Sequence, residues 1–122
     1  MGRPVVHFEI MGRDGANLRA FYATLFEWEL ETDGEHDYGT VDREANVTAD
    51  GVGIGGGVGG MQEYPGHVTF YVEVPDVEAS LEQAEQLGAT RLMGPEQIME
   101  AIEIGMFMDP EGNMIGLIRG QG

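Results

Sequence analysis

The segment GHVTFYVEVPD, residues 66–76, alternates apolar and polar side chains over most of its length. Such alternation, rich in β-branched and aromatic residues, predicts a half-buried strand whose apolar face packs on the core. The polar positions bring together an imidazole, a hydroxyl, a phenol and a carboxylate, a set that suits the lining of a polar pocket. The apolar face comprises Val68, Phe70, Val72 and Val74, and the polar face comprises His67, Thr69, Tyr71 and Glu73.

A second strand of the same kind lies near the N-terminus, in VVHFEIM at residues 5–11. His7 opens its polar face as His67 opens the later one, at an offset of 60 residues. Each strand is followed by an amphipathic helical pattern, at 16–26 and at 77–87, and then by three strand-like segments. The sequence therefore predicts an internal duplication of a βαβββ module.

One such module has a single helix and four strands, which is too little to bury both faces of its sheet. We therefore predict an α+β fold in which two βαβββ modules form a cupped mixed β-sheet with the helices on its outer face. Module 1 spans about residues 4–60 and module 2 about residues 66–120 of a single domain, 1–122. Within module 2, a strand at 89–93 is expected to end at a Gly94–Pro95 turn.

The charge balance excludes several kinds of partner. Twenty-two acidic residues face six basic ones, all arginine, for a net charge of −16. Such a surface repels phosphate backbones and anionic lipids, so we expect neither nucleic acid nor a membrane as partner. The acids form either a solvated surface suited to a salt-rich cytoplasm or a site for cations or a basic partner; their even spread favours the first.

The N-terminus enters a strand pattern directly, without the pattern of a signal peptide, and no apolar run approaches the ~20 residues that span a bilayer. The chain has no cysteine, which excludes disulfides and thiolate metal sites. We therefore expect a cytoplasmic protein.

The order and spacing of four segments resemble the vicinal oxygen chelate superfamily, which includes glyoxalase I, extradiol dioxygenases and bleomycin-resistance proteins. The resemblance implies a cup-shaped sheet around a small-molecule site in a homodimer, but no single reaction, because one fold hosts many. The segments are VVHFEI at 5–10, the helix with Phe21-Tyr22 and Leu25-Phe26 followed by Trp28, GHVTFYVEV at 66–74, and DPEGNMIGLI at 109–118.

In metal-using members of that superfamily, ligands come from the first and last strands of each module. The resemblance places first-strand ligands at His7 and His67, which form half a metal site. It places last-strand carboxylates at Gly116 and near Gly55 or Gly56, where this chain has glycine. Two imidazoles without an anionic ligand hold a divalent ion weakly, so we expect no resident cofactor and leave a divalent metal as the alternative.

Glu9 is the candidate catalytic residue. It follows His7 by two residues and therefore shares its face, about 7 Å along the strand. A carboxylate there could complete a metal site, orient the imidazole, or act as general base if burial raises its pKa. The competing interpretation is a solvated surface acid.

The run GVGIGGGVGG at 51–60 carries seven glycines in ten residues. It lacks the Gly-Lys-Ser/Thr ending of a phosphate-binding loop. The missing side chains instead leave space in the cup or permit close approach of another strand. The predicted ligand-binding residues are His7, Glu9, His67, Thr69, Tyr71, Met114 and Gly116.

The absent carboxylates favour a metal-independent protein that binds a small organic molecule, as in the resistance branch, and sequesters it or presents it to a partner. The alternative is a lyase, isomerase or dioxygenase that uses a metal on His7 and His67, or Glu9 as base. A third interpretation is a structural or regulatory dimer with a vestigial cavity. The sequence leaves open whether the protein is an enzyme.

The acidic surface makes stability depend on salt. Raising sodium chloride from low to molar concentration should raise the melting temperature, because counterions screen the repulsion among the acids. Sucrose at matched osmolality serves as the uncharged control. An identical melting temperature at low and at molar salt would contradict the expectation.

Overall fold

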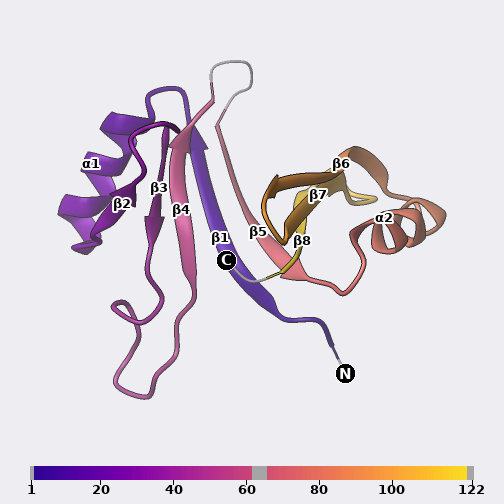
Figure 1. The fold of residues 1–122 in the computed structure, drawn as a ribbon, viewed down its shortest axis with the longest axis horizontal. Helices are drawn as coiled ribbons and strands as arrows, with labels where there is room; N and C mark the ends of the chain where they lie inside the picture. Colours follow the sequence, from indigo (N-terminus) through magenta and orange to yellow (C-terminus); the bar gives the residue numbers. More distant parts are fainter. Residues whose placement is uncertain (1, 62–65, 121–122) are drawn as a thin grey trace. The chain divides into compact units, whose positions relative to one another are not determined.

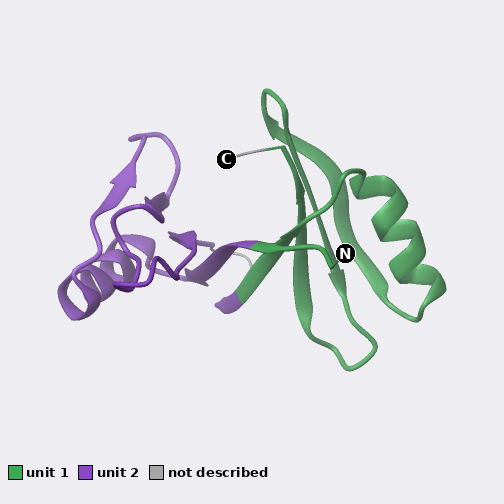
Figure 2. Cartoon of the chain, turned by 90° about the horizontal axis from the view of Figure 1, so that it is seen from below, with its two compact units in different colours: residues 1–5, 69–122 green, residues 6–68 purple. Residues whose placement is uncertain are grey.

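The computed structural model describes residues 2–61 and 66–120 and divides the chain into two compact units (Figures 1 and 2). Unit 1 takes in residues 1–5 and 69–122, and unit 2 takes in residues 6–68. Within the described residues, neither helix is long and apolar enough to cross a membrane.

Unit 2 has the strand order β2-β3-β4-β1, in which β4 and β1 are parallel and the other pairs antiparallel. Helix α1 begins after Asp14, whose carboxylate accepts a hydrogen bond from the Asn17 backbone N–H at 3.0 Å. The helix packs against β4. The elements are β1 (Val5–Gly12), α1 (Gly15–Phe26), β2 (Leu30–Thr32), β3 (Tyr38–Val41) and β4 (Gly55–Gly60).

An aromatic cluster supports the helix face of this sheet. The Trp28 ring lies 5.2 Å from that of Phe8 on β1, 5.8 Å from that of Tyr22 and 5.1 Å from that of Phe26. The Phe8 ring lies directly over Gly56, where a Cβ would fall 2.3 Å from the ring. Gly56 therefore leaves the space that the Phe8 ring occupies.

Unit 1 has the strand order β5-β8-β7-β6, with β5 and β8 parallel and the other pairs antiparallel. Its core forms where α2 covers the sheet, and consists of Val74, Val77, Leu81 and Leu117 with Val72 and Phe107 packed against them. The elements are β5 (His67–Glu73), α2 (Val77–Gln86), β6 (Thr90–Met99), β7 (Ile102–Met108) and β8 (Met114–Arg119).

The predicted α+β fold with two βαβββ modules and a mixed sheet is confirmed. The grouping of both modules into one domain stays a prediction.

The predicted end of the strand at 89–93 is wrong. β6 continues through a cis Gly94–Pro95 peptide to Met99, with shifts in its pairing to β7 on either side. Gly94 has φ +101°, and a Cβ there would lie 2.6 Å from the Gly105 Cα. The residue pair that looked like a turn is thus a strand irregularity that only glycine fits.

The predicted burial of the start of β5 is also wrong. Val68 is 74% exposed and Phe70 39%, whereas Thr69 and Tyr71 on the polar face are buried. The core under α2 takes in Val72 and Val74 but neither of the two earlier apolar residues.

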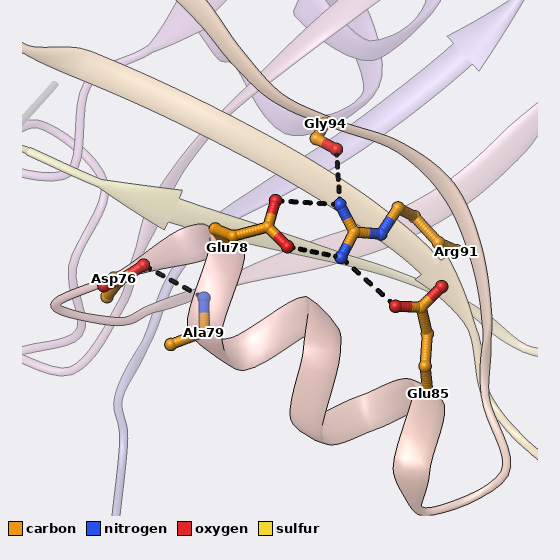
Figure 3. A network of polar contacts seen from close by, with 6 residues as sticks. All are labelled: Asp76, Glu78, Ala79, Glu85, Arg91 and Gly94. Carbon is orange, nitrogen blue, oxygen red and sulfur yellow. Dashed lines mark hydrogen bonds and ion pairs between the residues drawn. The ribbon is translucent and has the colours of Figure 1, made fainter.

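Arg91 ties α2 to β6 (Figure 3). Its guanidinium donates to both carboxylate oxygens of Glu78, at 3.0 and 2.8 Å, to Glu85 at 3.1 Å, and to the Gly94 carbonyl at 3.0 Å. This hydrogen bonding holds the pKa of Glu78 below its ordinary value. The planar guanidinium donates hydrogen bonds to α2 and β6 at the same time, which the ammonium group of a lysine could not reproduce.

We expect Arg91→Ala to lower the melting temperature more than Arg119→Ala. Arg119 has one recorded ion pair, to Glu103 at 3.3 Å, whereas Arg91 joins two elements through four hydrogen bonds. Arg91→Lys should recover only part of the loss. Thermal melting checks this, and equal losses for the two alanine variants would contradict it.

Candidate functional site

Four polar side chains of unit 2 form one hydrogen-bonded cluster, called here the Glu9 cluster: His7, Glu9, Tyr38 and His67. The Tyr38 hydroxyl lies 2.8 Å from His7 Nε2 and donates to Glu9 Oε1 at 3.2 Å. The other carboxylate oxygen, Glu9 Oε2, lies 3.1 Å from His67 Nε2. The carboxylate is therefore held at both oxygens by groups of the chain.

The strands explain this arrangement. Alternation along β1 puts His7 and Glu9 on one face, and β4 runs parallel beside it with Gly57 opposite Glu9. Tyr38 comes from β3, on the far side of β4, and its ring crosses β4 over Gly57. A Cβ at residue 57 would lie 2.0 Å from the Tyr38 Cζ. Glycine at that position is what allows the phenol to reach the cluster.

The cluster is mostly shielded from water, with the side chains of Glu9 12% and His67 15% exposed. Burial lowers the pKa of His7 below its ordinary value of 6.5, and the negative charge of Glu9 opposes this only in part. His7 is therefore neutral at neutral pH. Because the Tyr38 proton goes to Glu9, His7 Nε2–H donates to the phenol oxygen.

A divalent metal ion requires several donor side chains that converge on one point. Across residues 2–61 and 66–120, no group of three His, Cys, Asp or Glu side chains is arranged to hold one. In the Glu9 cluster, the Tyr38 hydroxyl stands between His7 and Glu9, and His67 Nε2 faces the carboxylate. As arranged here, these residues do not fit a metal ion.

The two glycines considered for a last-strand ligand in module 1 lie on opposite faces of β4. Gly55 is opposite His7 and shares the face of the cluster, whereas Gly56 is opposite Phe8 and lies under its ring. Neither position supplies an anionic donor.

The remaining predicted ligand-binding residues lie in unit 1. The buried Thr69 donates its hydroxyl hydrogen bond to the Met114 carbonyl at 2.5 Å. Tyr71 is also buried, and its ring lies over Gly116, where a Cβ would fall 2.5 Å from the ring. The space beside Gly116, a predicted ligand-binding residue, is thus filled by a tyrosine ring.

Tyr38 is not among the site residues predicted from the sequence, because its strand is only four residues long. The signal that could have found it is the glycine run in the neighbouring strand. Consecutive glycines at Gly55, Gly56 and Gly57 create room on both faces of β4, and an aromatic residue on the adjacent strand is suited to fill it.

An open groove of about 420 Å³ in unit 2 lies away from the cluster. Its aromatic lining residues are Phe26 and Trp28, and Trp28 packs on Phe8, which points to the opposite face of β1 from His7. The rest of the lining is Asn46, Val47, Thr48 and Val52.

Comparison with known proteins supports the sequence resemblance. The family described as "Glyoxalase-like domain" matches residues 7–118. Among curated proteins, none matches this sequence.

Solved structures share the fold at low identity. Methylmalonyl-CoA epimerase from Streptomyces coelicolor, in complex with 2-nitronate-propionyl-CoA, is 17% identical with a TM-score of 0.64, covering 100% of this chain and 99% of that one. A glyoxalase/bleomycin resistance protein/dioxygenase superfamily member from Vibrio splendidus is 16% identical with a TM-score of 0.63, covering 97% and 99%. The epimerase from Mycobacterium tuberculosis is 12% identical with a TM-score of 0.60, covering 97% and 88%.

The lowered pKa of His7 gives stability a pH dependence. Between that pKa and 6.5, the unfolded chain binds a proton that the folded chain does not, so stability falls as pH drops through 6.5. We expect His7→Gln to flatten this fall in urea unfolding measured from pH about 7.5 to about 5.

His36→Gln is the matched control. Its hydrogen bond to Asp33 raises the pKa of exposed His36, so this histidine stabilises the fold below pH 6.5, and the gain is lost as pH rises through the raised pKa. His36→Gln should therefore leave the acid-side fall in place or steepen it. An unchanged profile in His7→Gln would show that His7 is not its source.

Proposed function

Because this chain belongs to the glyoxalase-like family, within the vicinal oxygen chelate superfamily, we propose that it binds a small organic molecule at the Glu9 cluster without a metal. The observation that carries the proposal is the carboxylate of Glu9, which is 12% exposed and accepts hydrogen bonds at both oxygens. Such a group is held in one orientation before a ligand arrives, which reduces the ordering that binding requires.

The charge of the site points to the class of ligand. Glu9 is the acidic group of the cluster, His7 beside it is neutral, and the whole chain carries −16. A phosphate- or carboxylate-bearing ligand would meet repulsion there. A neutral or cationic molecule with N–H donors would complement the carboxylate instead.

The arginines strengthen this argument, because their recorded contacts lie outside the cluster. Arg19 pairs with Asp37, and Arg43 donates to the Gly51 and Gly53 carbonyls. Arg91 and Arg119 bind glutamates of unit 1. Arg3 and Arg13 are exposed. Four of the six arginines are thus engaged elsewhere, and we infer that an anionic ligand such as an acyl-CoA is disfavoured.

The proposal includes a homodimer and a cytoplasmic location, as the sequence led us to expect. The ligand would be sequestered, or presented to a partner, rather than transformed.

A second candidate is an enzyme that moves a proton at a carbon next to a carbonyl. The specific observation in its favour is the Glu9–His67 pair, 3.1 Å apart and mostly shielded from water. A carboxylate that orients an imidazole is a common general-base arrangement. The solved epimerases, one of them in complex with methylmalonyl-CoA, share the fold at low identity.

A matched pair of planar probes tests the binding proposal. The aromatic cation proflavine should bind, measured by fluorescence anisotropy at physiological salt, whereas 9-anthracenecarboxylate and coenzyme A should not. Glu9→Gln should weaken proflavine binding by about tenfold, because it removes one charge-assisted contact.

Glu29→Gln is the control, since it removes the same charge from an exposed position. Equal weakening by both substitutions would assign the binding to the general acidic surface and contradict the proposal. Tighter binding of 9-anthracenecarboxylate or coenzyme A than of proflavine would also contradict the proposal. Exchange of the α-proton of methylmalonyl-CoA in heavy water, lost in Glu9→Gln, would favour the enzyme instead.

A further inference from the structure

We propose that Tyr38 closes the Glu9 cluster against divalent metal ions, and that His7, Glu9 and His67 become a metal site once this side chain is shortened. The inference goes beyond the proposed function, because it concerns what the cluster excludes and does not depend on any organic ligand.

The first step is the position of the phenol oxygen. It lies 2.8 Å from His7 Nε2 and 3.2 Å from Glu9 Oε1, and His67 Nε2 binds the other oxygen of the same carboxylate. The hydroxyl therefore lies between His7 and Glu9, and His67 is linked to it only through the far oxygen of the Glu9 carboxylate.

The second step is the chemistry of those donors. Two imidazoles and one carboxylate are a set that divalent transition metals bind, at about 2.0–2.2 Å from each donor. The phenol oxygen is 2.8 Å from His7 and 3.2 Å from Glu9, about 0.6 to 1.2 Å beyond metal–ligand distances, so both donors would have to move inward and His67 would have to turn toward the same point. The donor types thus suit an ion, while the occupied centre does not admit one.

The third step is the slot that holds the tyrosine ring. A Cβ at Gly57 would lie 2.0 Å from the Tyr38 Cζ, and one at Gly59 would lie 2.7 Å from its Cδ1. Two glycines of β4 therefore form the floor on which the ring lies. The glycine run, which no part of the proposed function explains, is accounted for as the seat of Tyr38.

Three substitutions at residue 38 separate the hydroxyl from the ring. Tyr38→Phe removes the hydroxyl but leaves the ring in its slot, so the centre stays blocked. Tyr38→Thr and Tyr38→Ala empty the slot, and threonine also suits a strand. Each protein would be titrated with Co²⁺ and Zn²⁺ by calorimetry, and the Co²⁺ complexes examined by visible absorption.

We expect Tyr38→Thr and Tyr38→Ala to bind one ion at least tenfold more tightly than the wild type and Tyr38→Phe. The cobalt spectrum should show protein nitrogen and oxygen ligands. Adding His67→Ala to Tyr38→Thr should abolish the gain in metal affinity. This result would distinguish binding at the Glu9 cluster from weak binding by surface acids.

Wild-type protein that binds cobalt as tightly as Tyr38→Thr would overturn the inference. So would folded Tyr38→Thr and Tyr38→Ala proteins that bind no more than the wild type. If a shortened variant unfolds, rescue of its melting transition by Zn²⁺ supports the proposal, and failure of rescue contradicts it. Proflavine binding is measured with EDTA present, so the two proposals fail independently.

Discussion

The hydrogen bonding of the Glu9 carboxylate is the interaction on which the arrangement of unit 2 depends. A carboxylate this shielded from water destabilises a fold unless donors replace the lost water. His67 and Tyr38 supply those donors, one to each oxygen, from strands that lie far from β1 in the sequence. The need to pair both oxygens of the carboxylate therefore links the positions of β1, β3 and β5.

Glycine residues leave the room that a tyrosine ring needs beside a closely packed sheet. The Tyr38 ring lies over Gly57 in unit 2, and the Tyr71 ring lies over Gly116 in unit 1. In each unit, a tyrosine occupies the volume beside a glycine of the module's last strand. At Gly57 and Gly116, the space left by the missing side chain is filled by an aromatic ring that lies against the backbone.

The few arginines of this acidic chain hold parts of the fold together. Arg91 joins α2 to β6, and Arg43 holds the Gly51–Gly53 segment through its carbonyls. These guanidiniums serve the fold, which leaves the Glu9 cluster with histidine and tyrosine as its recorded donors. The donor set of the Glu9 cluster thus has two causes. The chain has few bases, and its arginines hold the fold together at other places.

The sequence by itself determined the order of elements and the duplication, because strand and helix periods are local properties of the chain. It also placed His7, Glu9 and His67 as candidates, through alternation and the 60-residue offset. Tertiary structure decided the rest. Tyr38 joins the cluster by crossing a strand of glycines, and Val68 is exposed because the core under α2 does not include it. Both outcomes depend on contacts between segments distant in sequence, which no local period encodes.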